Sequence, residues 1–263
     1  GGDDTYRLAP YLFSNDELKN AVTKKPFLGF SDTTLNHFML HKVGLPTFYG
    51  QAFLPDVCEL APEMLPYTKR YFEEFLKTGT IREVRPSELW YTSRTDFSPE
   101  ALGTELPAHK NTGFELLQGP AQFEGEILGG CIDSMYEMFS GWRYGDMPEV
   151  CRNYGLFPSM DDWRGKILLM ESCEEYMPPE TYKKALETLQ ETGVFDAVSG
   201  VLVGKPMDDM YHAEYKKLLV SIIANKELPI LCNINVGHAQ PRCILPFGVP
   251  AHVDADAQVI RFG

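Results

Sequence analysis

The chain has 263 residues and a net charge of −13; 44% of its residues are hydrophobic and 23% are charged. These values are typical of one large or two small globular domains and exclude a wholly disordered chain. The acidic balance argues against a nucleic-acid polymer as partner, because phosphate binding needs clustered Lys and Arg. No apolar run approaches the ~18 residues that cross a membrane, so we expect no membrane partner.

The first informative stretch is Gly-Phe-Ser-Asp-Thr-Thr at residues 29–34. The apolar run at 26–30 predicts a short buried strand. The next predicted element is a helix with one apolar face formed by Leu35, Phe38, Met39 and Val43. Ser31 would lie in the turn between them, with its hydroxyl facing a cleft and the next backbone N–H placed to bind an oxyanion. Alternatively, Ser31 only caps the helix.

Further along the chain, strands and helices alternate. We expect a helix at 63–77, a polar connection at 85–118, and then strands at 124–130, 166–170, 197–203 and 229–234, with helices at 179–192 and 209–225 between them. Asp208 and Asp209 are interpreted as the N-cap of the last helix. This alternation predicts an α/β fold with mainly parallel strands. We divide it into a nucleophile-bearing α/β domain at 1–85, a connecting segment at 86–120 and a C-terminal α/β domain at 121–263.

Three predicted strands end in residues that suit nucleophilic catalysis: Ser31, Glu171 and His238. Reacting groups gather at the carboxyl edge of open α/β sheets. There an imidazole would take the serine proton, while a carboxylate would fix the imidazole tautomer. Glu174 and Glu175 are rival acids within one turn. Alternatively, Glu171 belongs to a solvated helix start and His238 is an ordinary loop histidine.

These motifs resemble those of the LD-carboxypeptidase and microcin C immunity serine peptidases. The likeness also includes the opening Gly-Gly-Asp-Asp-Thr-Tyr-Arg-Leu-Ala-Pro-Tyr, Leu-Met-Glu before 172, Asn-Val-Gly-His at 235–238 and the double glycine at 129–130. The resemblance implies that Ser31 is the nucleophile, Glu171 the orienting acid and His238 the base. It assigns the oxyanion hole to the backbone N–H groups of Asp32 and, of the two opening glycines, Gly2.

The resemblance also implies a flavodoxin- or Rossmann-like N-terminal domain. Members usually carry a further stretch before the opening glycines, so we expect this domain to be incomplete here. The family tends to pair, which implies a homodimer. Its chemistry is hydrolysis of an amide bond through an acyl-enzyme and needs no cofactor or metal. The substrate would be a muropeptide or a peptidyl or aminoacyl nucleotide, and we favour the nucleotide.

Three residues are candidates for substrate binding. Arg7 pairs with a substrate carboxylate or holds the loop at Tyr6. Phe97, in the polar connection, would stack on a flat substrate group. Cys131 stands where the family often has asparagine, so any contact made by that amide is lost or altered. A competing hypothesis is a ligand-binding protein that keeps the fold without catalysis. An ordinary esterase would need Gly-x-Ser-x-Gly, which is missing because Thr33 follows Asp32.

The remaining reactive residues favour an intracellular protein without a metal. The six cysteines form no CxxC pair, so we interpret them as reduced and the setting as cytoplasmic. Cys173 is a weak rival nucleophile, because no basic neighbour would lower the pKa of its thiol. His37 and His41 are spaced i, i+4 but lack a third ligand, which makes a zinc site a poor hypothesis.

Overall fold

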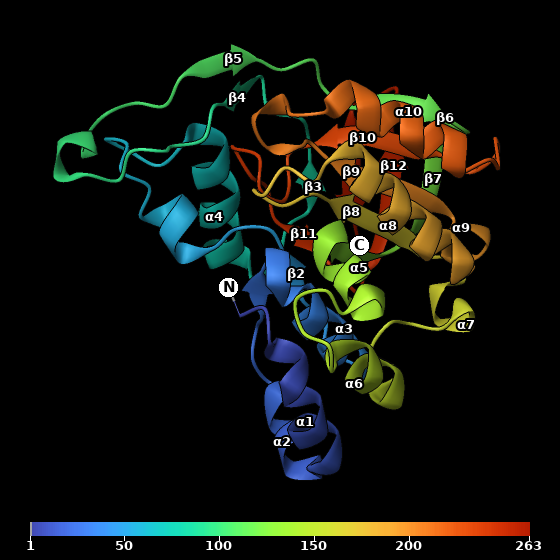
Figure 1. Cartoon of the computed structure of the whole chain (residues 1–263). Coiled ribbons are helices and arrows are strands. Elements are labelled where there is room, and N and C mark those ends of the chain that lie inside the picture. Colours follow the sequence, from blue (N-terminus) through green and yellow to red (C-terminus); the bar gives the residue numbers. More distant parts are fainter. Residues whose placement is uncertain (1) are drawn as a thin grey trace.

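The computed structural model describes residues 2–263 and has an α/β fold built around one large sheet (Figure 1). The sheet order is β3 (Glu83–Val84), β13 (Val259–Phe262), β12 (Pro250–Asp254), β7 (Gln122–Cys131), β8 (Ile167–Glu171), β9 (Gly200–Gly204), β10 (Ile230–Ile234) and β6 (Glu115–Gln118). The four central strands, β7 to β10, run parallel, whereas the strands on both flanks are antiparallel. The predicted α/β class and its parallel strands are therefore confirmed, within a mixed sheet.

Helices cover the large sheet, and in Figure 1 the helices α5, α8, α9 and α10 lie in front of it. The helices of this half are α5 (Ile132–Ser140), α6 (Met147–Tyr154), α7 (Met160–Trp163), α8 (Pro179–Glu191), α9 (Val194–Ala197) and α10 (His212–Ile222). Helix α8 shows why they pack. Its buried side chains recur at i, i+3, i+4 and i+7, namely Tyr182, Ala185, Leu186 and Leu189. Central strand β8 is buried throughout, as strands with both faces covered must be.

The turn that contains Ser31 follows the first strand of a separate small sheet of β1 (Leu28–Gly29), β2 (Phe48–Tyr49) and β11 (Leu245–Pro246). A 3-10 turn (Ser31–Thr33) follows β1 and leads directly into α3 (Thr34–Lys42). The remaining helices of this half are α1 (Ala9–Ser14), α2 (Asp16–Val22) and α4 (Pro66–Thr78), besides a 3-10 turn at Thr5–Leu8 and a π-helical turn at Phe53–Val57. Helices α1 and α2 project from the lower end in Figure 1.

The segment between β4 (Leu89–Tyr91) and β5 (Ala108–Lys110) extends away from the body, at the left of Figure 1. It contains a 3-10 turn (Pro99–Ala101), and we call residues 92–107 the arm. A buried ion pair between Arg94 Nε and Glu59 Oε1, 2.5 Å long, joins it to the body. Within residues 2–263, no helix has the length and apolar character required to span a membrane.

Two strand pairings connect the first and last segments of the chain. Strand β3, from the first segment, pairs with β13 in the large sheet. Strand β11, from the last segment, pairs with β2 in the small sheet. The division at 85 and 120 stays a proposal about the organisation of the chain, because the strands of its first and last parts are interleaved.

The loop before α10 differs from its prediction. Helix α10 begins at His212, its N-cap position is Tyr211, and no side chain caps it. Asp208 and Asp209 have positive φ values of 53° and 60°, which turn their carboxylates toward other segments. Asp208 accepts hydrogen bonds from the backbone N–H of Ser93 (2.7 Å) and the hydroxyl of Tyr176 (2.6 Å). The predicted N-cap is therefore wrong. Asp208 instead connects its own loop to the loops that contain Ser93 and Tyr176.

Candidate active site

Ser31 lies in the turn between β1 and α3 with φ at +66°, a region that residues other than glycine seldom occupy. Two side chains hold this backbone. The N–H of Ser31 donates to Tyr49 Oη at 3.0 Å, and the hydroxyl of Thr34 donates to the Ser31 carbonyl at 2.7 Å. Such strained geometry persists only where its surroundings fix it, and it is common at functional sites.

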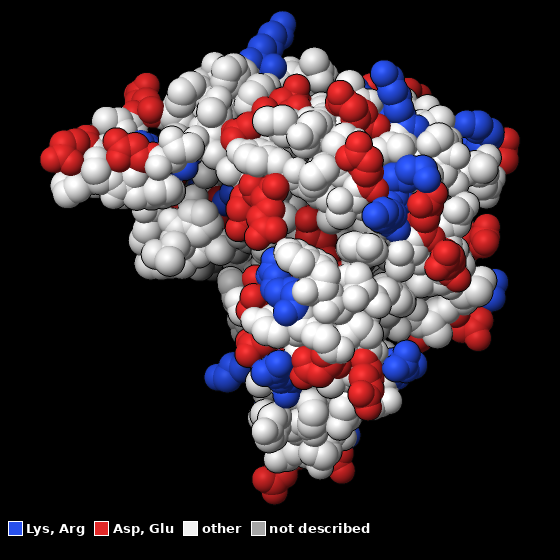
Figure 2. Space-filling model, in the orientation of Figure 1, with Lys and Arg blue, Asp and Glu red and all other residues white. Residues whose placement is uncertain are grey.

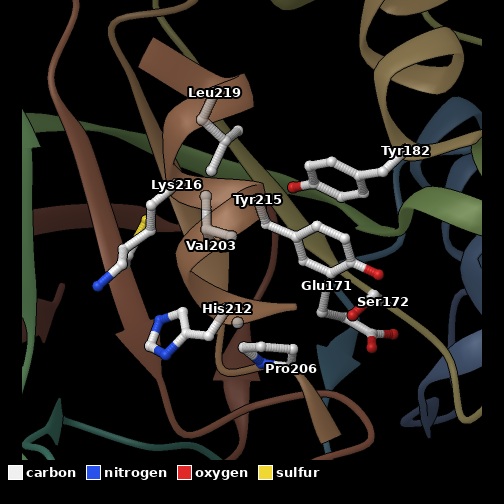
Figure 3. A pocket seen from close by; sticks show the side chains of 11 residues that line it. Glu171, Ser172, Tyr182, Val203, Pro206, His212, Tyr215, Lys216 and Leu219 are labelled. Atoms are coloured by element: carbon white, nitrogen blue, oxygen red, sulfur yellow. The ribbon is translucent and has the colours of Figure 1, made fainter. Parts of the chain in front are cut away.

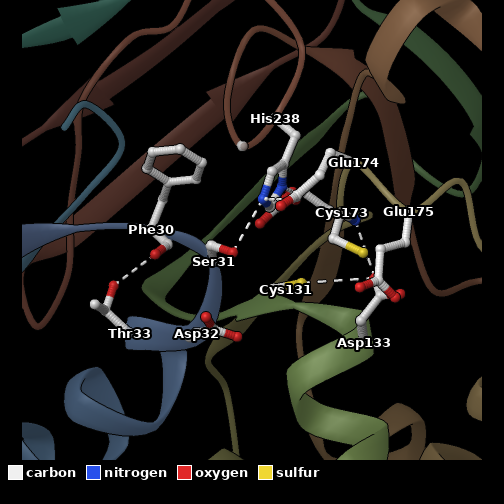
Figure 4. Close-up of polar contacts among 12 residues, drawn as sticks. Phe30, Ser31, Asp32, Thr33, Cys131, Asp133, Cys173, Glu174, Glu175 and His238 are labelled. Carbon is white, nitrogen blue, oxygen red and sulfur yellow. Dashed lines mark hydrogen bonds and ion pairs between the residues drawn. The ribbon is translucent and has the colours of Figure 1, made fainter. Parts of the chain in front are cut away.

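The structure brings the hydroxyl, imidazole and carboxylate predicted from three strand ends into one hydrogen-bonded row. Nε2 of His238 lies 3.0 Å from Ser31 Oγ, and its Nδ1 lies 2.7 Å from Glu171 Oε2. Figure 4 shows the serine hydroxyl facing the ring of His238. Glu171 is the last residue of β8, and His238 lies in the loop after β10. The His238 and Glu171 side chains are buried, whereas Ser31 is half-buried.

The loop that carries His238 is held from two sides. Gly237 has φ at +87°, and a Cβ there would lie 2.3 Å from Glu171 Oε2, so only glycine admits the carboxylate. Arg242 is buried, donates to the carbonyl of His238 at 2.9 Å and pairs with Asp56 at 2.9 Å. The ring of Phe30 packs edge-on against His238 at 5.0 Å between centroids. The imidazole is therefore fixed in position before any substrate arrives.

Glu174 is a second carboxylate partner of the same imidazole. Its Oε2 lies 2.9 Å from His238 Nε2, the nitrogen that also faces Ser31. A carboxylate accepts a hydrogen bond there only if Nε2 carries a proton, since Nδ1 already donates to Glu171. Burial lowers the pKa of His238, but the carboxylates of Glu171 and Glu174 outweigh it and raise that pKa to about 9. The hydrogen bond to His238 lowers the pKa of Glu174 to about 2.

Arg143 is a cation beside the turn that contains Ser31 and Asp32, and the sequence analysis missed it. Its guanidinium lies within 4 Å of four carboxylates: Asp3 (3.4 Å), Asp32 (3.6 Å), Glu137 (3.1 Å) and Glu175 (3.7 Å). Burial raises the pKa of Glu137 to about 7, although Arg143 opposes that rise. No motif marks Arg143, which lies in a loop and whose partners are scattered along the chain. Figure 2 shows acidic side chains gathered near the centre of one face, beside a basic patch.

Two cavities lie near the row of three residues. A cavity of about 390 Å³ is lined by parts of α5, α8 and the loop after β8, including Tyr136, Trp142, Arg143, Glu175 and Lys184. This volume is in the range of pockets that hold small molecules. A second cavity, lined in part by Glu171, lies between β8 and α10, where Tyr182 stacks on Tyr215 (Figure 3). At about 10 Å³ it has room for one water molecule, so it is no substrate pocket.

The other predicted site residues take different places. Asp32 is the second residue of the 3-10 turn, where backbone N–H groups lack intrahelical partners. Gly2 is exposed, with φ at +119°, and its carbonyl accepts from the N–H of Thr5. The other opening glycine lies outside the described residues. The N–H of Ser31 is already bound to Tyr49, which leaves the Asp32 N–H as the donor nearest the serine in sequence.

The three candidate substrate contacts do not form one cluster of hydrogen bonds. Arg7 donates to Tyr6 Oη (3.0 Å) and pairs with Asp146 (3.3 Å), which matches the alternative that it holds the Tyr6 loop. Phe97 lies on the arm, and 73% of it is exposed. Cys131 is buried at the end of β7, where its N–H donates to Thr34 Oγ1. Its thiol lies 3.6 Å from Asp133 Oδ2.

Within residues 2–263, no group of three or more His, Cys, Asp or Glu has metal-binding geometry. All six cysteines are free thiols. Burial raises the pKa of Cys173 far above its ordinary value, which keeps this thiol protonated and unreactive. His37 is buried between Thr47 Oγ1 and the carbonyl of Gly29, and burial lowers its pKa to about 4.

Comparison with known proteins identifies the family of the chain. Residues 1–50 match the model of the LD-carboxypeptidase N-terminal domain, and residues 124–253 match that of the LD-carboxypeptidase C-terminal domain. The microcin C7 self-immunity protein MccF of Escherichia coli is 26% identical over 265 residues, covering 97% of this chain and 70% of that protein.

Solved structures extend the likeness to the whole described fold. An MccF-like protein from Streptococcus pneumoniae, solved in complex with AMP, is 60% identical, has a TM-score of 0.97 and is matched over 100% of this chain and 76% of its own. MccF in complex with aspartyl sulfamoyl adenosine shares the fold at 24% identity and a TM-score of 0.74, over 100% of this chain and 73% of its own. The chain therefore belongs to the LD-carboxypeptidase family of peptidases, as its motifs predicted.

Proposed function

We propose that the protein is a serine peptidase that hydrolyses an amide bond through an acyl-enzyme on Ser31. The observation that carries this proposal is the row in which His238 lies 3.0 Å from Ser31 Oγ and 2.7 Å from Glu171. These distances are within the reach that proton transfer between nucleophile, base and orienting acid requires.

In the proposed acylation, Oγ of Ser31 bonds to the substrate carbonyl carbon while its proton passes to Nε2 of His238. The carbonyl π electrons move onto oxygen, and Glu171 stabilises the imidazolium through Nδ1–H. The C–N bond then breaks, and the proton on Nε2 goes to the leaving nitrogen. In the second half, water gives a proton to Nε2 as its oxygen attacks the acyl ester, and Ser31 leaves with that proton.

The oxyanion would accept hydrogen bonds from the backbone N–H groups of Asp32 and Gly2. Asp32 follows the nucleophile at the start of a helical turn, where the free N–H groups and the dipole favour negative charge. Removal of one such donor in comparable sites lowers the rate by ~100- to 1,000-fold.

We propose an aminoacyl or peptidyl nucleotide as the substrate. The relative with 60% identity was solved with AMP, and the 390 Å³ cavity beside the nucleophile turn offers an aromatic ring, Trp142, and two cations, Arg143 and Lys184. An aromatic face and cations suit a base and a phosphate. In this proposal Phe97 stacks on the base of the nucleotide, and Cys131 lines the part of the site that binds the acyl group. Arg7 acts indirectly, by holding the loop at Tyr6. A homodimer and a cytoplasmic location stay predictions of the sequence.

The test has two steps. The protein and its Ser31→Ala variant are treated with a fluorophosphonate, and the modified residue is identified by mass spectrometry. Hydrolysis is then measured for an aspartyl-adenylate analogue with an amide link, a muropeptide tetrapeptide and p-nitrophenyl acetate. We expect label on Ser31 alone and fastest turnover of the nucleotide.

Each other outcome has a defined meaning. Fastest turnover of the muropeptide would replace the nucleotide by the second family substrate and keep the mechanism. Binding of AMP with equal affinity by wild type and Ser31→Ala, without label or turnover of any compound, would favour the ligand-binding protein and overturn the peptidase.

A further inference from the structure

Tyr49 is a buried hydroxyl that contacts both ends of the proposed catalytic row without belonging to it. Its O–H donates to Glu171 Oε1 at 2.6 Å, and its oxygen accepts the N–H of Ser31 at 3.0 Å. The residue is fully buried in β2. Glu171 is thus held on both oxygens, by Tyr49 through Oε1 and by His238 through Oε2.

The surroundings of Tyr49 are built to bring it there. A Cβ on Gly130 would lie 2.7 Å from the Tyr49 ring and 2.3 Å from Thr34 Oγ1, so the second glycine of the 129–130 pair leaves room for both. Phe247 stacks on the Tyr49 ring with centroids 5.5 Å apart. The ring has no freedom to swing away, because its neighbours pack at interior density.

We infer that Tyr49 is a positioning residue for the proposed hydrolysis. Its single hydroxyl fixes the backbone of Ser31 relative to the carboxylate of Glu171. The inference rests on the proposed function. Tyr49 does not reach the reacting atoms, so it acts through Ser31 and Glu171. Its effect on the backbone matters because the N–H that it accepts belongs to Ser31, whose φ is +66°.

The hydroxyl also changes the electrostatics of the base. A hydrogen bond to Glu171 Oε1 spreads the negative charge that Nδ1–H of His238 faces. Without it, the carboxylate would attract the imidazole proton more strongly and raise the pKa of His238. The other charged groups near this ring are Glu174 at Nε2 and Asp133 across the cleft, while Arg242 contacts its backbone carbonyl.

The test compares Tyr49→Phe with Tyr67→Phe, which removes the hydroxyl of a half-buried tyrosine bonded to the Arg85 carbonyl away from the site. We measure the rate of fluorophosphonate labelling of Ser31 against pH, and the low-field proton resonance of His238 by NMR. For Tyr49→Phe we expect labelling about tenfold to one hundredfold slower. The rate of labelling falls at low pH, and the pH at which it falls should move up by about half a unit. The pKa of His238 from the NMR titration should move up by the same amount.

A second variant keeps the inference testable if Tyr49→Phe does not fold. Incorporation of 3-fluorotyrosine at 49 retains the ring and makes the hydroxyl a stronger donor, so both titrations should move to lower pH. Equal effects of Tyr49→Phe and Tyr67→Phe, or slower labelling with no movement of either titration, would overturn the inference. Failure to label wild-type Ser31 would overturn the proposed function instead, and the NMR titration would still decide the role of Tyr49.

Discussion

Two regions of the molecule differ in how they are fixed. The inner region (Ser31, Tyr49, Glu171 and His238) is largely buried and joined by hydrogen bonds of 2.6–3.0 Å that cross from one sheet to the other. The outer region (Arg143, Glu174, Glu175 and Phe97) lies on loops and the arm, and its ion pairs run from 2.9 to 3.7 Å. The comparison suggests that the inner region sets the chemistry and the outer region sets the substrate and the pH range.

The strand ladders explain the difference. Glu171 ends β8, whose pairing with β7 and β9 fixes its depth. Ser31 and His238 lie outside strands but are fixed by hydrogen bonds to buried partners. The outer residues depend instead on ion pairs in which at least one side chain is partly exposed, and such pairs contribute less free energy. Substitutions in the inner region should therefore have large effects, and those in the outer region should have small ones that depend on pH or substrate.

The largest effect is expected for Glu171→Gln. The amide has nearly the same shape but cannot stabilise the imidazolium or keep the reactive tautomer. We expect labelling of Ser31 to slow by about 1,000- to 10,000-fold at neutral pH. Stopped-flow labelling, with circular dichroism to verify folding, measures it. A loss below tenfold in a folded variant would mean that Glu171 is not the orienting acid.

Gly130→Ala should break the inner region by sterics alone. The new methyl group would meet Thr34 Oγ1 at 2.3 Å and Tyr49 at 2.7 Å, at a φ of +144°. We expect the free energy of unfolding to fall by about 1–3 kcal/mol or more, measured by urea denaturation. Gly145→Ala is the matched control, since a Cβ there meets no atom within 4 Å. Similar losses in the two variants would show that the fit around Gly130 is not special.

Glu174→Gln should change the pH dependence. The base works only when Nε2 of His238 is free of its proton, so activity rises as pH passes the His238 pKa, which is about 9. Removal of the Glu174 charge lowers that pKa, and the acid limb of labelling should move down by about one pH unit. Activity at pH 7 then rises.

Glu175→Gln is the control for this change, because Glu175 contacts Arg143 at 3.7 Å instead of the imidazole. Its acid limb should stay in place. An acid limb that moves equally in both variants would show that any negative charge on this loop raises the pKa of His238. An acid limb that moves in neither variant would show that Glu174 does not control the pKa of the base.

The smallest effect is expected for Phe97→Ala, on the arm. If its ring stacks on the base of the substrate, KM for the adenylate analogue should rise by about two- to tenfold. Labelling by a small fluorophosphonate should not change, since that reagent offers no flat ring. Steady-state kinetics with both compounds tests this. An unchanged KM would remove Phe97 from the substrate site.

Much of the inner region could be predicted from the sequence, because short apolar runs mark strands and the residues after them must meet at one edge. This is how Ser31, Glu171 and His238 were found together. Tyr49 could not be found this way. It lies inside a two-residue strand, and a buried tyrosine in an apolar run normally indicates only core packing.

The outer region and the flanks of the sheet were harder to predict. Arg143 and Asp208 each contact a partner more than a hundred residues distant, Asp32 and Ser93 respectively, and no local pattern records such contacts. The hairpin of β12 and β13 was missed because its strands are short and half exposed. The N-cap at Asp208 failed because left-handed backbone at three residues redirects the carboxylates.

Strand β11 has a consequence for how the protein matures. Leu245 and Pro246 complete the sheet that carries the serine, and the N–H of Phe247 bonds to the carbonyl of Thr47. The proposed reactive centre therefore cannot assemble until the chain has been synthesised through Phe247. A nascent chain that ends before Leu245 would hold Ser31 without the third strand of its sheet, and we expect such a chain to lack the proposed hydrolysis.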